Sequence, residues 1–215
     1  MFKGSFAPTV SLEYTTNGVD WSDFVVGTTT ITLSNVGDRV AIRAKTTNQR
    51  MASGWSDAYF NRFDGSGALK ISGNINSLLD KNPEQVSSLP AYAFCSLFYD
   101  TNPFRDASEL TLPATSLGDY CYCRLFYSST GLEKSPYLAE ATLATACYDY
   151  MFANCTSLNE IKIGYEGNFS GTGVPQYAFN TWVNRVAASG TFYYNGTDTT
   201  RGDSAIPSGW TVQSF

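Results

Sequence analysis

"LGDYCYCRLFYSSTGL", residues 117–132, decides the fold because related versions of it occur three more times in the chain. Aligned on their first apolar residue, the others are "LPAYAFCSLFYDTNPF" from Leu89, "LATACYDYMFANCTSL" from Leu143 and the divergent "VPQYAFNTWVNRV" from Val174. The four units begin 28, 26 and 31 residues apart. This spacing indicates a solenoid, in which each unit buries its apolar side only by stacking on its neighbours.

The first ten residues of each unit fit the pattern of a helix. Counted from the first residue as offset 0, the apolar and small residues at offsets 0, 1, 4, 5, 8 and 9 share one half of a helix circumference at about 100° per residue. Ser88, Ser116 and Thr142 precede three of these segments, where an N-cap is expected. A turn then leads to a strand-like segment, clearest in "LNEIKI" at 158–163. We therefore predict helix–turn–strand units.

Residues 1 to about 75 follow a different pattern. Short alternating runs such as "TTTITLS" at 28–34 and "RVAIRAKT" at 39–46 are separated by turn-forming Asn-Gly and Gly-Asp pairs. Runs of this length favour a small antiparallel β-sandwich-like domain. The predicted fold class is thus α/β, with this domain at 1–75, a short leucine-rich-repeat solenoid at 76–188 and a C-terminal β cap at 189–215.

The five cysteines are interpreted as free thiols. On a helix Cys121 falls in the buried half and Cys123 about 200° further round, so the two sulfurs point to opposite sides and cannot bind one ion. The chain has no histidine, the usual partner in a zinc site. A Cys121–Cys147 disulfide is not expected, because packed helices lie about 8–10 Å apart and a disulfide needs Cα atoms within about 7 Å. Cys155, in the turn after the third segment, has no evident role.

The repeats resemble a known family. "AFCSLFYDTNPF", "CYCRLFYSSTGL" and "CYDYMFANCTSLNEIKI", together with "IPSGWTV", are similar to BspA-type leucine-rich repeats, whose units carry an Ala-Phe or Cys-Tyr pair, a Met-Phe or Leu-Phe pair and "NCTSL". The first two units depart from that pattern at the turn. The segments "LEYTTNGVDWSDF" and "ITLSNVGDRVAIRA" resemble the β module that often precedes such repeats in proteins of gut bacteria and tailed phages. The resemblance implies surface recognition rather than catalysis.

Composition limits the partners. With 15% charged residues and a net charge of −5, the chain has no basic surface for nucleic acid or anionic membranes. No segment approaches the roughly 20 apolar residues of a membrane-spanning helix, so no membrane insertion is expected. The start "MFKGSFAPTVSLEY" shows no export signal. That start favours a virion protein assembled in the host cytoplasm over a bacterial cell-surface protein.

Catalytic motifs are not found. Without histidine there is no Ser-His-Asp or Cys-His site. A glycosidase needs two carboxylates across a cleft, and the chain offers many acids, none of them in a motif. "RGD" at 201–203 is interpreted as part of a turn. We predict no enzyme activity, no metal site and no cofactor. The acids weighed were Asp57, Asp64, Asp100, Asp106, Asp119, Glu133, Glu140, Asp149 and Glu160.

The candidate site lies on the outer side of the predicted helices. Offsets 3, 7 and 10 fall together opposite the core and carry mostly tyrosine. Such rings would form a rigid platform for stacking on sugars or for a protein interface, unless they pack on each other or under the N-terminal half. The candidate residues are Tyr92, Tyr99, Tyr120, Arg124, Tyr127, Tyr150 and Tyr177.

Together these features predict a non-enzymatic structural or adhesion protein of a tailed-phage virion, of the head, tail-fibre or decoration type. Its partners would be other virion proteins or a cell-surface glycan or protein, and it could form a homo-oligomer. The alternative is a bacterial cell-surface leucine-rich-repeat adhesin. A more distant alternative is a glycan-cleaving enzyme, which would require a working pair of carboxylates.

Overall fold

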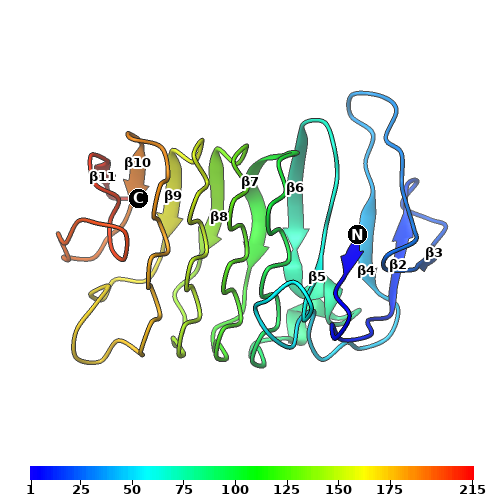
Figure 1. Ribbon diagram of the computed structural model, residues 1–215, viewed down its shortest axis with the longest axis horizontal. Coiled ribbons are helices and arrows are strands. Elements are labelled where there is room, and N and C mark those ends of the chain that lie inside the picture. The colour runs from blue at the N-terminus through cyan, green and yellow to red at the C-terminus, as the bar shows by residue number, and fades with distance from the viewer.

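The computed structural model describes residues 1–215 as a row of stacked units with an N-terminal module at one end (Figure 1). One strand from each unit joins a six-stranded parallel sheet in which sequence neighbours are also spatial neighbours. Its order follows the chain without a crossover, so each unit contacts chiefly the next. The strands are β6 (Leu69–Asn74), β7 (Phe104–Leu112), β8 (Lys134–Leu138), β9 (Glu160–Ile163), β10 (Thr191–Tyr193) and β11 (Thr211–Gln213).

Alternation along these strands decides which side of the sheet is buried. In β9 and β10, Ile161 and Phe192 face each other in register and are fully buried. Lys162 and Tyr193, one residue further on, pair in the same way but are half-buried on the other face. Because side chains alternate along a strand, one face of the sheet covers the core and the other meets solvent.

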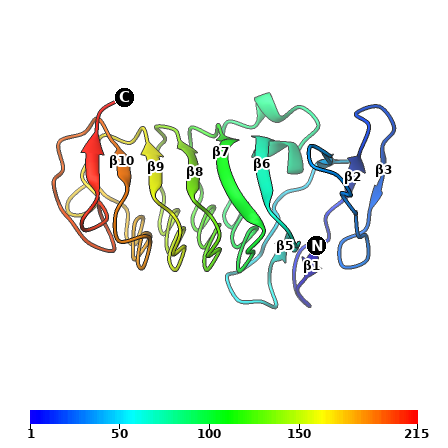
Figure 2. The same cartoon turned by 90° about the horizontal axis from the view of Figure 1, so that it is seen from above.

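The predicted α-helices are absent, and the helix–turn–strand fold class was wrong. The only helices are two short 3₁₀ turns, η1 (Ile75–Leu78) and η2 (Pro83–Gln85). The segments expected to be helical consist of consecutive turns, and Figure 2 shows them as narrow coils stacked beneath the sheet. We call them ribbons 1 to 4, covering residues 90–100, 118–128, 144–154 and 175–185.

Hydrogen bonding explains why a ribbon forms instead of a helix. The Leu125 N–H donates to the Tyr122 carbonyl three residues back, at 3.1 Å, whereas the Phe126 N–H donates to Met151 in the next ribbon, at 2.9 Å. In an α-helix every N–H would bond four residues back within its own segment. The alternation continues along all four ribbons, with five hydrogen bonds between each neighbouring pair. The ribbons therefore form a second hydrogen-bonded layer opposite the sheet.

Backbone conformation repeats every fourth residue in the ribbons. Twelve non-glycine residues at offsets 3, 7 and 11 have φ between 52° and 64°, the left-handed region, which costs an ordinary residue roughly 1–2 kcal/mol. Inter-ribbon hydrogen bonds and stacked side chains offset this cost. A period of four places offsets 4, 5, 8 and 9 inside, as a helix of 3.6 residues per turn also does. The predicted helix and the observed ribbon differ in which residues they bury only at later offsets and on the outer side.

The core lies between the ribbons and the sheet. Its centre is a file of rings at offset 5, in which Phe94, Tyr122, Tyr148 and Phe179 stack with centroids 5.9, 5.9 and 5.5 Å apart. A second file at offset 9 joins Phe98, Phe126 and Phe152 at 5.1 and 5.7 Å. Equivalent residues of successive units therefore pack directly on one another, as expected of a repeat stack.

Offset 12 explains Cys155. At this position the Thr101 and Ser129 hydroxyls both donate to the Phe98 carbonyl, at 2.7 and 2.6 Å. The Cys155 thiol donates in the same way to the Phe126 carbonyl, at 2.9 Å. All three side chains are buried, and each satisfies a carbonyl where its ribbon turns toward the sheet. Cys155 thus substitutes for a turn hydroxyl.

The N-terminal module is not the predicted sandwich. It contains a three-stranded antiparallel sheet, ordered β3-β2-β4, and a two-stranded sheet of β1 and β5. Residues 28–34, predicted as a strand, are irregular and mostly exposed, although Ile31 packs against the core. β6, from the predicted first domain, pairs with β7 of the solenoid. The strands are β1 (Phe2–Lys3), β2 (Leu12–Thr15), β3 (Ser22–Phe24), β4 (Ala41–Ala44) and β5 (Asn61–Arg62).

Both ends of the ribbon layer are covered. At the N-terminal end, the Met51 and Phe63 N–H groups donate to carbonyls of ribbon 1, at 2.7 and 2.8 Å. At the C-terminal end, the Val183 N–H donates to the Asp203 carbonyl at 3.1 Å, and the Asn184 side chain donates to the Asp203 carboxylate at 2.6 Å. Asp203 belongs to the "RGD" triplet, which here closes the last ribbon.

Candidate recognition surface on the turn ribbons

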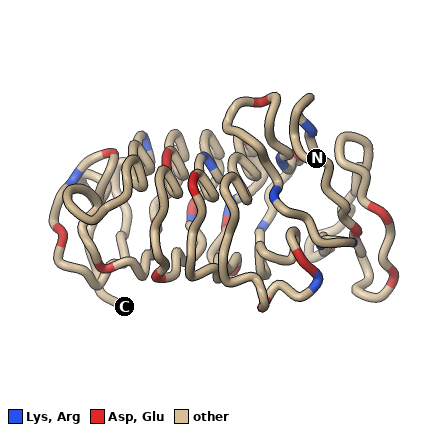
Figure 3. The backbone as a smooth tube through the Cα atoms, turned by 90° about the horizontal axis from the view of Figure 1, so that it is seen from below, with Lys and Arg blue, Asp and Glu red and all other residues tan.

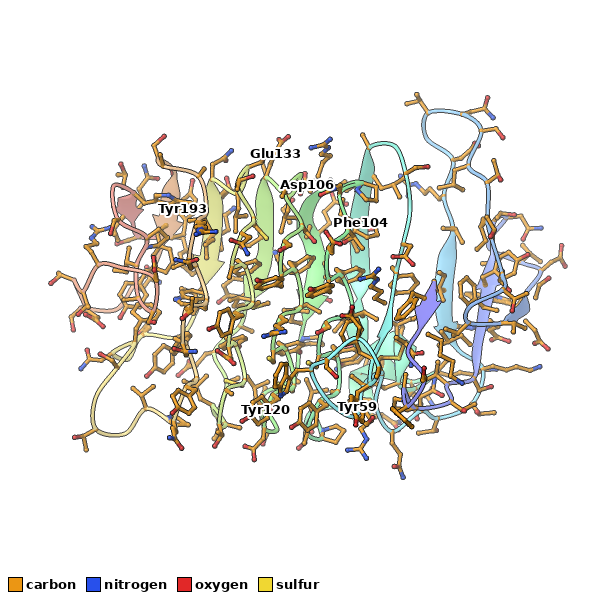
Figure 4. All side chains as sticks on the ribbon, in the orientation of Figure 1. Tyr59, Phe104, Asp106, Tyr120, Glu133 and Tyr193 are labelled. Atoms are coloured by element: carbon orange, nitrogen blue, oxygen red, sulfur yellow. The ribbon has the colours of Figure 1, made fainter.

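The seven predicted site residues all lie on the outer side of the ribbons. Figure 4 shows Tyr120 and Tyr59 at the lower end of the molecule, and Asp106 and Glu133 at the upper end. Six of the seven side chains are half-buried, and only Tyr177 is exposed, with 56% of its surface accessible to solvent. The period of four, rather than helical geometry, places them there. Five of them occupy left-handed positions: Tyr92, Tyr120, Arg124, Tyr150 and Tyr177.

The tyrosines form two short stacks rather than one ladder. Tyr92 and Tyr120 lie 5.1 Å apart between centroids, with 6° between their planes. Tyr99 and Tyr127 stack in the same way, at 5.3 Å and 6°. The rings therefore pack partly on each other, one of the two alternatives weighed for them. Tyr177, in ribbon 4, makes no ring pair with the other five tyrosines and is set apart from the site.

Arg124 stands at the centre of the surface. Its guanidinium carbon lies 4.8 Å from the ring centroid of Trp55 and 5.4 Å from those of Tyr127 and Tyr150. Contacts of this length are cation–π interactions, each worth about 0.5–1 kcal/mol at exposed sites. Trp55 remains 51% exposed. We call Trp55, Arg124, Tyr127 and Tyr150 the Arg124 cluster.

Sequence reasoning missed Trp55. It lies on the 52–60 loop of the N-terminal module, which is closed by pairing of Ala52 with Phe60 and folds over ribbons 1 and 2. The Phe60 ring contacts Tyr99, with centroids 5.5 Å apart. Part of the predicted site, including Tyr99, is therefore packed under the N-terminal half, as the sequence had allowed. Trp55 precedes Arg124 by 69 positions, and no local pattern connects them.

The surface carries few charged groups, and its tyrosine hydroxyls are neutral. Burial raises the pKa of Tyr92 and Tyr99, so their hydroxyls stay protonated and can donate hydrogen bonds at neutral pH. Burial also raises the pKa of Asp149 in ribbon 3, while a 2.8 Å hydrogen bond from Asn180 and the nearby Arg124 oppose that shift. Acidic and basic residues are scattered along the molecule without a continuous basic stripe (Figure 3).

A second aromatic patch lies on the open face of the sheet. Phe215 packs edge-on against Tyr137 and Tyr193, with centroids 5.7 and 6.5 Å away. The Lys162 ammonium lies 4.9 Å above the Tyr193 ring and 3.3 Å from the Glu160 carboxylate. Strand periodicity could have located the members in β8, β9 and β10, but not Phe215, which lies beyond the end of β11.

Other sites in the fold are modest. Two open hollows, of about 390 and 520 Å³, lie in the N-terminal module. The structure holds no cluster of three or more His, Cys, Asp or Glu side chains placed to bind a metal ion. It also contains no helix of the length and hydrophobicity needed to cross a membrane. The arrangement best suited to contact another molecule is thus the Arg124 cluster, which offers ring faces, hydroxyls and a guanidinium.

Comparison with protein-family models, curated proteins and solved structures finds no match to this chain.

Proposed function

We propose that this chain is a non-enzymatic recognition protein, a structural or adhesion component of a tailed-phage particle, that binds a protein or glycan through the Arg124 cluster. The observation that carries the proposal is the partly exposed guanidinium held between the rings of Trp55, Tyr127 and Tyr150. Tryptophan, tyrosine and arginine are the residues that most often dominate binding energy at interfaces.

The rigidity of the support favours binding. Arg124 and Tyr150 are fixed in left-handed conformations, and their N–H groups donate to the next ribbon at 2.8 and 3.0 Å. A surface that is already ordered loses little conformational entropy when a partner binds. Ring faces can stack on the apolar face of a sugar or on an aromatic side chain, while the guanidinium and hydroxyls supply directional hydrogen bonds.

The particle assignment rests on the resemblance of the repeats to BspA-type units and of the N-terminal segment to a module found in phage and gut bacterial proteins. Under this proposal the chain is assembled in the host cytoplasm into the virion and meets other virion proteins or a cell-surface glycan. A bacterial surface adhesin would use the same cluster, and the experiment below separates the two.

The test is a pulldown of the purified chain against whole phage particles and against an array of bacterial cell-surface glycans. The variants are Trp55→Ala and Arg124→Ala, with Tyr137→Ala on the sheet face as the matched control. Each cluster variant should weaken binding at least tenfold, the loss typical of a residue that dominates an interface. The control should bind as the wild type does.

The outcomes separate the alternatives. Binding to particles supports the virion assignment, whereas binding to glycans alone supports the adhesin. Binding that survives in both cluster variants but fails in Tyr137→Ala would move the site to the sheet face and overturn the proposal. Turnover of a glycan, abolished by substitution of a carboxylate, would contradict the non-enzymatic assignment.

A further inference from the structure

Cys95 and Cys123 occupy the same position, offset 6, in ribbons 1 and 2. Parallel pairing of Ser88 with Ser116 fixes the register of the two units, and the Ser96 N–H donates to the Cys123 carbonyl at 2.9 Å. Hydrogen-bonded neighbouring chains lie about 4.8 Å apart. That spacing falls inside the range of about 4.4–6.8 Å between Cα atoms that a disulfide requires.

Equivalent cysteines therefore lie closer together in the ribbons than they would in packed helices. Packed helices would separate equivalent cysteines by about 8–10 Å, but ribbons joined by main-chain hydrogen bonds bring them into contact. Cys95 and Cys123 belong to the same small buried cluster, and the neighbouring Cys95 thiol is the largest cause of the raised pKa of Cys123. The stacked rings of Tyr92 and Tyr120, three residues earlier in each ribbon, have centroids 5.1 Å apart and confirm how closely equivalent side chains approach.

The pair is separate from the main core. Both cysteines are buried, at 0% and 1% exposure, in a small cluster with Ala52 and Phe60 of the 52–60 loop. The apolar side chains packed against them come from that loop and from three half-buried tyrosine rings, and the polar contacts come from Ser96 and Asp149. Lifting the loop would expose the two sulfurs while the layer between ribbons and sheet stayed closed.

We propose that Cys95 and Cys123 form a reversible disulfide when a peroxide reaches them. The thiolate of one cysteine attacks an oxygen of hydrogen peroxide, the O–O bond breaks, and a sulfenic acid and hydroxide form; the hydroxide takes up the proton that the thiol had lost and becomes water. The second thiol then attacks the sulfenic sulfur and displaces its oxygen as a second water. The two thiols lose two electrons and two protons, which the peroxide takes up, and a dithiol reductant reverses the reaction by exchange.

Reaction in the closed protein is slow. The neighbouring Cys95 thiol and burial both raise the pKa of Cys123, and the Asp149 carboxylate, 4.0 Å from its sulfur, acts in the same direction. The protonated thiol is a poor nucleophile, so oxidation depends on the thiolate fraction and on opening of the 52–60 loop. Cys121 and Cys147 also share an offset, but they point into the main core, where no single loop covers them.

The experiment is peroxide treatment of the whole chain, alkylation of the remaining thiols and peptide mapping by mass spectrometry. The wild type should lose about 2 Da, the two hydrogens of one disulfide, and the crosslinked peptide should join Cys95 to Cys123. The link should be absent in Cys95→Ser and Cys123→Ser, present in Cys147→Ser, and removed by dithiothreitol. Its rate of formation should rise with pH, by up to about tenfold per unit while the thiols remain protonated.

Phe60→Ala tests the role of the loop, because removing that ring should speed the crosslink without changing its position. A link between Cys121 and Cys147, or oxidation to sulfinic acid with no link, would overturn the proposal. Wild-type mapping alone decides this, so the result stands even where a variant folds poorly.

Discussion

At the residue scale, the hydroxyl of Tyr122 lowers the stability of the fold, and other ribbons have a residue without that hydroxyl at the same offset. The Tyr122 ring stacks between those of Phe94 and Tyr148, and its hydroxyl is buried without a hydrogen-bond partner. An unpaired buried polar group costs about 1–3 kcal/mol, and ribbons 1 and 4 carry phenylalanine at this offset. Tyr122→Phe should therefore raise the free energy of unfolding in urea by about 1 kcal/mol. Tyr127→Phe, on the outer side, should change it little, and a loss of stability in Tyr122→Phe would reveal a partner for the hydroxyl.

Glu13 gives a prediction about pH. Its carboxylate accepts a 2.8 Å hydrogen bond from Arg43 and lies 3.3 Å from the Lys81 ammonium, contacts that hold its pKa below the ordinary value of 4.5. Because the folded-state pKa is depressed, the stabilisation is present above pH 4.5 and is lost as pH falls through the folded value. Glu13→Gln should melt below the wild type at neutral pH, and the gap in Tm should close in acid. A gap independent of pH would show that the charge contributes nothing.

At the element scale, the left-handed positions are the strained part of each ribbon. Thr181 has φ 52°, where a β-branched residue is especially unfavourable. Glycine there would remove roughly 1–2 kcal/mol of strain and add about 0.5–1 kcal/mol of entropy cost, so Thr181→Gly should stabilise the fold by about 0.5–1 kcal/mol. Glycine at Val183, which is not among the left-handed residues, should instead destabilise it. Urea unfolding measures both, and equal losses in both variants would contradict the ribbon conformation.

The ribbons also show how much of the fold could be predicted from the sequence. The repeat spacing located the four stacking units, and the offsets of Leu117, Cys121, Leu125 and Phe126 identified residues that are buried. The helix prediction was wrong because periods of 3.6 and 4 residues both place offsets 4, 5, 8 and 9 on the buried side. Helical geometry places offsets 3, 6, 7 and 10 outside the buried half, yet several residues at these offsets are buried: Cys95, Ser96, Cys123, Ala146 and Ala153. Left-handed tyrosines and arginine carry no sequence signal comparable to glycine.

The candidate site was predictable only in part. Offsets 3, 7 and 10 led to the outer tyrosines and Arg124, because those positions face outward in either geometry. The covering by the 52–60 loop, and with it Trp55, depends on how the N-terminal module packs on the repeats. That contact is long-range and follows from no periodicity.

At the scale of the whole molecule, stability depends on covered ends. Asp203 accepts the Val183 N–H through its carbonyl and the Asn184 side chain through its carboxylate. In a stack of units coupled to nearest neighbours, loss of an end cap should loosen the last unit first. Asp203→Ala should thus speed amide hydrogen exchange in ribbon 4 more than in ribbon 2. Asp57→Ala, an exposed acid on the 52–60 loop, is the matched control, and equal acceleration in every ribbon would contradict nearest-neighbour coupling.

Main-chain hydrogen bonds between ribbons define this fold, and they can be observed directly. Scalar couplings across hydrogen bonds, measured by NMR on the isotopically labelled chain, connect each amide nitrogen with the carbonyl it bonds. The structure predicts that the Phe126 amide couples to the Met151 carbonyl and the Leu125 amide to the Tyr122 carbonyl. Coupling of the Phe126 amide to the Tyr122 carbonyl, four residues back, would instead show an α-helix and contradict the ribbon, its outward surface and the cysteine pair together.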